Sequence, residues 1–260
     1  GALVYINDFE GKVTKFNLTN MSEDGLGNPI NLYDSTTLFW AGSNKTNGRY
    51  MYHSMDATIG KTTNKLWLFA GTGDYERIAD TTSGVENLLI GIKDPDYPFY
   101  APVEAAKNAD DITDCTNTTN DTPPGANCPE SADRGWYITL DNYKKVTAEP
   151  TVSSGLVYFP IYKPKTSNKA CELGDAYICA ADDECGSNYS SKLGTNTSTQ
   201  ANEKCAYVGQ GILSRIVTFA GKLFANIAGS SSTSSKQDLV TVDGIAGEVT
   251  TYRSSWRQNY

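Results

Sequence analysis

The sequence predicts an all-β fold, arranged as a propeller-like array of about three to four blades. Three observations lead to this prediction. The chain is rich in Tyr, Thr, Ser, Asn and Gly, short strand-like runs alternate with glycine-containing turns, and three sections share one layout. β-branched and aromatic residues favour strands, whereas Gly, Asn and Ser favour the turns that join them.

Strand-like runs recur along the whole chain. They occupy residues 3–18, 65–78, 87–94, 134–142, 146–162, 174–186, 211–229 and 238–258. Many short strands with Gly turns are typical of a sandwich, a barrel or a propeller. We expect residues 1–260 to form one propeller-like domain, with the natural start of the protein upstream of Gly1.

The repeated layout consists of a small-residue or Pro lead-in, a strand, a turn and a second strand. It occurs in "ATIGKTTNKLWLFAGTG" (57–73), "AEPTVSSGLVYFPIY" (148–162) and "LSRIVTFAGKLFANIAG" (213–229), and a further strand follows each copy. One blade cannot bury both of its faces alone, so its apolar face needs the next blade. The hairpin at 3–18 is predicted to close an earlier unit.

The middle copy yields the sharpest structural prediction. Pro150 should begin a strand, where it has no ladder donor to lose, and residues 153–155 should form the turn. Leu156 and Tyr158 should then belong to the core.

Long insertions interrupt the repeat at residues 95–129, 163–200 and 229–237. A short helix is expected at Val103 to Ala109 within the first insertion. Loops on a rigid β scaffold are where binding usually occurs, so these insertions are the expected binding regions.

The charge and hydropathy of the chain exclude several classes of protein. A net charge of −8 argues against a nucleic-acid-binding protein, which normally has a clustered basic face. No apolar run of about 18 residues is present, so no membrane span is predicted. Seven Asn-x-Ser/Thr sequons are taken as signs of exposed polar loops; they lie at Asn17, Asn20, Asn44, Asn117, Asn120, Asn188 and Asn196.

Six cysteines lie in polar, loop-like surroundings without the spacing of a zinc site: Cys115, Cys128, Cys171, Cys179, Cys185 and Cys205. Disulfides in an exported protein are therefore predicted. The expected pairing is Cys115 with Cys128, and the other four cysteines form two further bonds.

No catalytic or cofactor-binding residue is predicted. His53 is the only histidine, so a Ser-His-Asp triad would have to use it, and we interpret it as a packed or exposed strand residue. The "GTG" at 71–73 lacks the third glycine and helix of a dinucleotide fingerprint, which indicates a turn at a strand end.

Acidic clusters occur at 94–96, 110–114 and 182–184, and none has the ligand spacing of an EF-hand loop. Asp182, Asp183 and Glu184 are the candidate metal ligands, and whether they bind calcium stays open. A paired-carboxylate glycosidase also stays open, because the separation of two acids cannot be read from the sequence.

Five motifs, in order along nearly the whole chain, resemble the PilC/PilY family of type IV pilus tip-associated adhesins. "LVYINDFEGKVTKFNL" is similar to the family's "YVGDLxGNLWRFDL", and "LWLFAGTGDYERI" followed by "NLLIGIKD" is similar to "VYFGTGKYL" and "YGIWD". "GWYITLDNYKKVTAEPTVSSGLVYFPIYKP" resembles "GWYLDLxxGERVVxxPxVxxGxVxFTTxxP". "GDAYICAADDECG" stands at the family's "LDAxTG" turn, and "SSWRQ" matches its C-terminal "SWRE/Q".

This resemblance implies a modified, quinoprotein-like β-propeller at the C-terminus of a large exported protein. It implies a non-enzymatic role in pilus assembly, pilus extension and surface adhesion, at the pilus tip on the cell surface. The implied partners are minor pilins and a host or abiotic surface. The family's regulatory calcium loop would lie upstream of residues 3–18, so calcium is expected only in the full-length protein and no cofactor is expected in this segment. The cysteine-rich part between Cys171 and Cys205 departs from the family pattern.

Two other classes of function remain as alternatives. One is a quinoprotein-like or glycan-processing enzyme on a propeller, which would need an axial acidic or metal cluster and often a stacking Trp. Trp40, Trp67, Trp136 and Trp256 are interpreted as strand core. The other is a eukaryotic glycoprotein ectodomain, which only the sequons favour.

Overall fold

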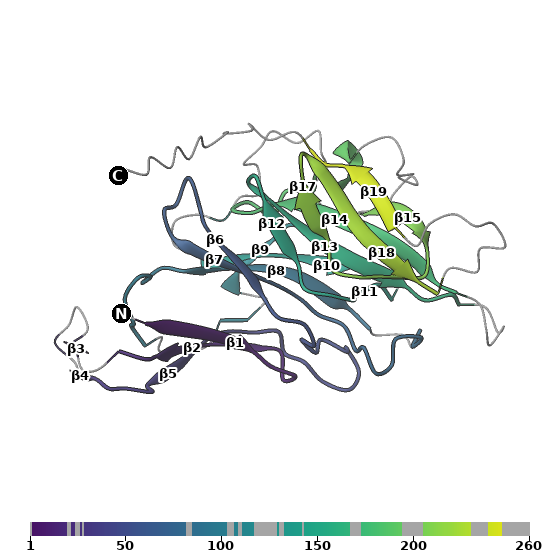
Figure 1. Cartoon of the computed structure of the whole chain (residues 1–260). Helices are drawn as coiled ribbons and strands as arrows, with labels where there is room; N and C mark the ends of the chain where they lie inside the picture. Colours follow the sequence, from purple (N-terminus) through teal and green to yellow (C-terminus); the bar gives the residue numbers. More distant parts are fainter. Residues whose placement is uncertain are drawn as a thin grey trace, which may run out of the picture.

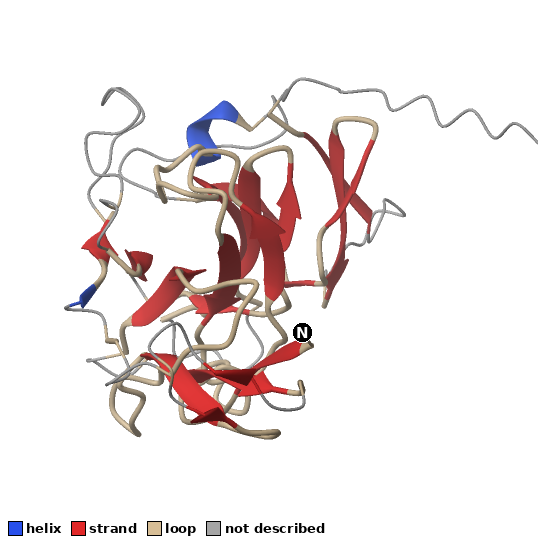
Figure 2. Ribbon diagram, turned by 90° about the vertical axis from the view of Figure 1, so that its left-hand side faces the viewer, coloured by secondary structure: helices blue, strands red, loops and turns tan. Residues whose placement is uncertain are grey.

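The computed structural model describes residues 2–19, 22–23, 27, 29–81, 85–102, 107–108, 111–116, 129, 133–141, 143–166, 173–193, 205–229 and 239–245. Strands make up nearly all of its regular structure (Figures 1 and 2). They are β1 (Leu3–Asn7), β2 (Lys12–Asn17), β3 (Ser22–Glu23), β4 (Pro29–Ile30), β5 (Ser35–Trp40), β6 (Asp56–Ile59), β7 (Leu66–Gly71), β8 (Asn87–Asp94), β9 (Thr113–Asp114), β10 (Gly135–Leu140), β11 (Lys145–Val146), β12 (Thr151–Ser153), β13 (Leu156–Lys163), β14 (Asp175–Asp182), β15 (Ala206–Gln210), β16 (Ile212–Leu213), β17 (Val217–Phe219), β18 (Lys222–Ala228) and β19 (Leu239–Asp243). Ser190–Lys192 forms one turn of 3-10 helix.

The described strands form four main sheets that follow one another along the chain. The first sheet has the order β1-β2-β5, and the second has the order β6-β7-β8-β10-β9. The third runs β11-β13-β14-β15, with β12 also paired to β13, and the fourth runs β16-β18-β17, with β19 paired to β18. Apart from the parallel pair of β9 with β10, every ladder in these four sheets is antiparallel. The all-β, propeller-like prediction is therefore confirmed.

The three repeated sections are equivalent in the structure. Each becomes an antiparallel hairpin, namely β6–β7, β12–β13 and β17–β18. The second strand of each hairpin then pairs with the strand that follows it, which is β8, β14 or β19. The three sections that share a layout in the sequence therefore also have strands in equivalent positions.

Two of these hairpins share the same turn. Ser154 (φ 56°) and Gly155 (φ 81°) join β12 to β13, while Ala220 (φ 51°) and Gly221 (φ 75°) join β17 to β18. A two-residue loop with positive φ at both positions is the type I′ turn, whose twist suits a hairpin. Pro150 lies immediately before β12, so its predicted place at the start of a strand is also confirmed.

The four sheets pack on one another in chain order and bury three apolar layers (Figure 1). Phe39 of β5 packs with Leu68 of β7 between the first and second sheets. Phe69 and Phe159 meet between the second and third sheets. Tyr158 belongs to the layer between the third and fourth sheets.

Successive residues of β13 therefore face opposite neighbours, because side chains alternate between the two faces of a strand. Leu156 and Tyr158 lie in one layer, and Val157 and Phe159 lie in the other. All four are buried, which confirms the predicted core assignment.

Two expectations about the first 20 residues are wrong. The hairpin β1–β2 does not close its unit, since β5 follows and pairs with β2 as the last strand of the first sheet. Asn17 is not in an exposed loop; it is buried at the end of β2, where its amide Nδ2 donates to the carbonyl oxygens of Thr19 and Asn31.

The expected helix at Val103 to Ala109 falls mostly outside the described residues, and Lys107 within it forms a parallel bridge to Phe39. Within the part of the chain that the structure describes, no helix has the length and apolar character needed to cross a membrane.

Candidate functional site

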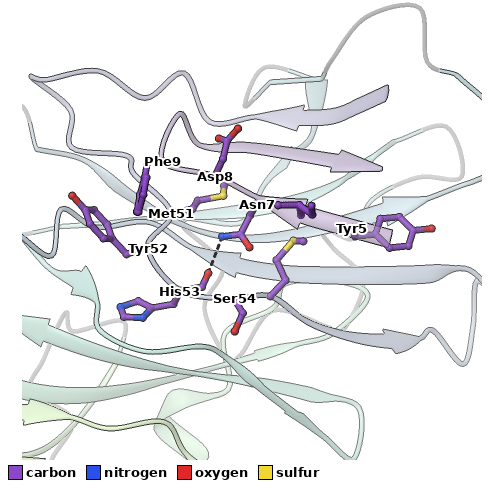
Figure 3. A pocket seen from close by; sticks show the side chains of 10 residues that line it. Tyr5, Asn7, Asp8, Phe9, Met51, Tyr52, His53 and Ser54 are labelled. Atoms are coloured by element: carbon purple, nitrogen blue, oxygen red, sulfur yellow. Dashed lines mark hydrogen bonds between the residues drawn. The ribbon is translucent and has the colours of Figure 1, made fainter. Parts of the chain in front are cut away.

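A pocket of about 530 Å³ lies between β1 with its following turn and the connecting segment Met51–Met55 (Figure 3). Residues Tyr5–Phe9 form one wall and Met51–Met55 form the other. The amide Nδ2 of Asn7 donates to the carbonyl oxygen of His53 at 2.7 Å, which ties the two walls together. Each wall is one continuous stretch of chain, and we therefore describe the pocket as a groove. We refer to it below as the β1 groove.

Aromatic rings gather beside the β1 groove. Phe9 and Tyr52 have ring centroids 4.8 Å apart, and Tyr50 meets Tyr52 edge to face at 6.4 Å. His53 meets Tyr75 edge to face at 5.5 Å. Phe9 stands at the turn after β1 with 63% of its surface exposed. Aromatic side chains supply much of the energy of protein interfaces, so this rim is suited to contact with another molecule.

His53 lies in the wall of the groove and not on a strand, which corrects the sequence-based interpretation. Its ring is half-buried, and burial lowers its pKa, although the carboxylate of Glu149 opposes this effect. The neighbouring Ser54 hydroxyl donates to Glu149, which also forms an ion pair with Arg215. Among the described residues, then, Ser54 and His53 are not arranged as the nucleophile and base of a triad.

A buried ion pair fixes β1 and β2 against the second sheet. Lys15 Nζ of β2 lies 2.8 Å from Asp94 Oδ2 at the end of β8, and both side chains are 0% exposed. The Tyr5 hydroxyl donates to the same carboxylate oxygen at 2.6 Å, and Lys15 Nζ also donates to the Phe99 carbonyl at 2.8 Å. Burial first, and then the Asp94 carboxylate, raises the pKa of Tyr5, so its hydroxyl remains a donor.

The sequence contained little signal for these buried charges, because lysines are normally exposed. Lys144 and Lys145 are also buried, just before and at the start of β11. Lys145 Nζ donates to the Asp80 carbonyl at 2.7 Å, and burial lowers its pKa to about 8. Lys144 Nζ lies 5.1 Å from the ring centre of Tyr177. In the sequence, the one sign that Lys144 and Lys145 could be buried was their position between the strand-like runs 134–142 and 146–162.

The candidate metal ligands in the turn after β14 form hydrogen bonds with different parts of the chain. One oxygen of Asp182 accepts the backbone N–H groups of Glu184 and Cys185, which closes the turn. The Glu184 carboxylate instead reaches across to the loop between β6 and β7 and accepts three hydrogen bonds from Thr62 and Thr63.

All three carboxyl groups of this turn have shifted pKa values. Burial raises the pKa of Asp182, although its hydrogen bonds from Cys185 and Glu184 oppose this effect. Burial acts to raise the pKa of Glu184, but the hydrogen bonds from Thr63 and Thr62 together outweigh burial and lower it. Burial, followed by the charges of Asp182 and Glu184, raises the pKa of Asp183 to about 6. Across the described part of the chain no group of three or more His, Cys, Asp or Glu residues is placed to hold a metal ion. Metal binding by this turn stays a prediction.

The cysteines follow the predicted pattern only in part. Cys179 of β14 is bonded to Cys205 beside β15, and Cys185 is also disulfide-bonded, as expected for the second half of the chain. Cys115 is a buried thiol that donates to the Cys185 carbonyl at 3.1 Å, and burial raises its pKa to about 12. The predicted Cys115–Cys128 disulfide is therefore wrong, because Cys115 is a thiol in the structure. Cys128 and Cys171 lie outside the described residues.

The tryptophans occupy two kinds of position. Trp67 and Trp136 are fully buried between the second and third sheets, as expected for strand core. Trp40 is instead 44% exposed on β5, where its indole N–H donates to the Glu10 carbonyl, so the core assignment is wrong for it. Trp256 lies outside the described residues.

The fold is similar to that of the C-terminal domain of Pseudomonas aeruginosa PilY1, with a TM-score of 0.55 and 13% sequence identity. The similarity covers 92% of this chain and 57% of that domain, so the chain spans little more than half of the known structure. BamB from Moraxella catarrhalis matches at 11% identity over 99% of this chain and 82% of BamB. Its TM-score of 0.16 is too low to indicate a shared fold. No protein-family model and no curated protein sequence matches the chain.

The resemblance that five short motifs indicated is thereby confirmed at the level of the fold. This fold is a propeller-like, disulfide-containing β structure of the kind seen in the C-terminal domain of PilY1.

Proposed function

We propose that this chain is a pilus-associated domain of an exported protein and acts without enzymatic activity in type IV pilus assembly, pilus extension and surface adhesion. The observation that supports the proposal is the similarity in fold to the PilY1 C-terminal domain over 92% of the chain. The order of the five motifs along the sequence supports it independently.

The proposed location is the pilus tip on the outside of the cell, within a larger protein whose propeller-like part includes residues 1–260. Disulfide bonds persist in oxidising compartments, and the Cys179–Cys205 bond is consistent with an exported chain. The proposed partners are minor pilins and a host or abiotic surface. The aromatic rim of the β1 groove, where Phe9 is exposed and packs against Tyr52, is a suitable contact surface.

The proposal is tested in a bacterium that carries the gene. Deletion of the codons for residues 1–260 from the chromosomal gene should reduce both the number of surface pili and the fraction of adherent cells. A gene copy with Trp136→Ala, which damages the buried layer, should restore less function than wild type. Trp40→Ala, at a position 44% exposed, is the matched control and should restore function fully. Unchanged piliation and adhesion after the deletion, with the remainder of the protein still exported, would contradict the proposal.

A further inference from the structure

Three side chains from three different sheets form one chain of contacts. Ser54, Glu149 and Arg215 each lie two residues before a repeat hairpin begins, at β6, β12 and β17. The Ser54 hydroxyl donates to Glu149 Oε2, and Arg215 Nη1 forms an ion pair with Glu149 Oε1. The repeat therefore brings equivalent positions together, and the two carboxylate oxygens of Glu149 link the third sheet to the second and the fourth.

The same three strands are also joined directly beside this chain of contacts. The Val152 N–H donates to Asp56 Oδ2 at 2.8 Å, which ties β12 to β6. The Thr151 hydroxyl donates to the Ile216 carbonyl oxygen at 2.6 Å, which ties β12 to the residue before β17. These bonds hold the strands in place. The Glu149 side chain is 29% exposed, so it can change partners without disturbing a buried layer.

His53 is the titratable ring next to this chain of contacts. It is half-buried, and its Nε2 is buried without a hydrogen-bond partner among the described residues. Burial lowers the pKa of His53, and the negative charge of Glu149 opposes this effect. The other titratable groups around the ring are Tyr75, which packs edge to face at 5.5 Å, and Asp8 and Tyr52, which line the same groove. A proton on His53 is therefore stabilised by Glu149.

Arg215 and a protonated His53 both attract the Glu149 carboxylate. If pairing with Arg215 weakens the hold of Glu149 on that proton, the proton must weaken the ion pair by the same amount. We propose that His53 and the Ser54–Glu149–Arg215 contacts form a pH-sensitive latch, in which a proton on His53 draws Glu149 away from Arg215 and loosens the link to the fourth sheet.

The direction of the switch follows from the environment of His53. Because its pKa is lowered from 6.5, the folded state with neutral His53 is favoured above pH 6.5, where the latch is closed. The stability from this group is lost as the pH falls through the lowered value, and the latch opens. This inference concerns contacts between the sheets and does not depend on the proposed pilus function.

The latch is tested first by titrating His53, whose imidazole signal is unambiguous in NMR because the chain has one histidine. In Glu149→Gln the midpoint pH should fall by about 0.5, the size typical of a partly exposed ion pair. In Arg215→Met it should rise by a similar amount. Lys222→Met is the matched control, since Lys222 and Arg215 are both 53% exposed and ion-paired in the fourth sheet, and it should leave the midpoint unchanged.

The converse effect is measured by thermal unfolding. Arg215→Met should lower the melting temperature more at pH 8 than at pH 5, because the ion pair contributes most when His53 is neutral. In a His53→Gln background the loss should be equal at the two pH values, since the proton site has been removed.

Three results would overturn the proposal. These are an unchanged His53 midpoint in Glu149→Gln, a midpoint in Arg215→Met that does not differ from that in Lys222→Met, and an Arg215→Met loss that is already equal at both pH values with His53 in place. The last result would show that the ion pair is structural and insensitive to the proton on His53.

Discussion

The two inner sheets and the two outer sheets are built from the same repeat but have different surroundings. β8 and β13 of the inner sheets are buried along nearly their whole length. β1 and β18 of the outer sheets alternate between more and less exposed residues. A strand covered on both faces has a continuous apolar run, whereas a strand covered on one face alternates. The inner strands are therefore covered on both faces, whereas each outer strand leaves one face more exposed.

The largest expected difference between inner and outer sheets is the loss of stability when a tryptophan in each is replaced by alanine. Trp136→Ala removes a fully buried ring between the inner sheets and its hydrogen bond to the Asp183 carbonyl, so the free energy of unfolding should fall by about 3–5 kcal/mol. Trp40→Ala, on an outer sheet and 44% exposed, should cost about 1 kcal/mol. Urea denaturation measures both values. Equal losses would show that the inner and outer sheets do not differ in this way.

The same contrast explains how much of the fold the sequence predicted. Residues 148–162 carry a run of β-formers around Ser-Ser-Gly, and local preference and tertiary packing agree there. The strands, the turn and the buried Tyr158 were therefore all predictable. The assignment of the hairpin at 3–18 failed because β5 is separated from β2 by a long connection, and no local pattern shows which strand pairs across such a gap.

The candidate site was less predictable than the fold. The β1 groove joins residues 5–9 to residues 51–55, and its shape depends on a contact from Asn7 to His53 across 46 positions. The acidic turn at 182–184 was visible as a cluster, but its partners Thr62 and Thr63 lie more than 100 residues earlier. A sequence shows which groups are polar, and packing decides which of them meet.

The second prediction concerns the joint between an outer and an inner sheet. Asp94→Asn leaves the charge of Lys15 buried without its carboxylate, so the free energy of unfolding should fall by about 3 kcal/mol. The double variant Lys15→Met/Asp94→Leu removes both charges and should cost less than the single change. Chemical denaturation of the two variants separates these outcomes. A double variant less stable than Asp94→Asn would contradict the view that the unpaired charge is the main cost.

A third, smaller effect should appear between the inner sheets as a dependence on pH. Burial raises the pKa of Asp183 from 3.8 to about 6, so the folded state holds this proton more tightly than the unfolded chain does. Stability from this group is present below pH 3.8 and is lost as the pH rises through about 6. Asp183→Asn should therefore raise the free energy of unfolding at pH 8 by about 1 kcal/mol, allowing for solvent screening, and change it little at pH 3.5.

Glu184→Gln is the matched control for that experiment, since the pKa of Glu184 is lowered from 4.5. Stability from Glu184 is present above its ordinary pKa and is lost as the pH falls through the lowered value. The Gln variant should accordingly be less stable than wild type at pH 8. Thermal unfolding across this pH range measures both variants, and a gain in stability for Glu184→Gln at pH 8 would reverse the assignment of the two carboxylates.

The smallest effect compares one turn in an inner sheet with the same turn in an outer sheet. Ser154 and Ala220 both have positive φ at the first position of a type I′ turn, where Asn before Gly is preferred. Ser154→Asn and Ala220→Asn should each raise the free energy of unfolding by about 0.5–1 kcal/mol, since both residues are strained in this conformation. The gain should be similar at the two sites, because turn strain depends on the backbone and not on how deeply the sheet is buried. Measured melting temperatures that rise for Ser154→Asn alone would mean that the hairpin β17–β18 unfolds separately from the rest of the molecule.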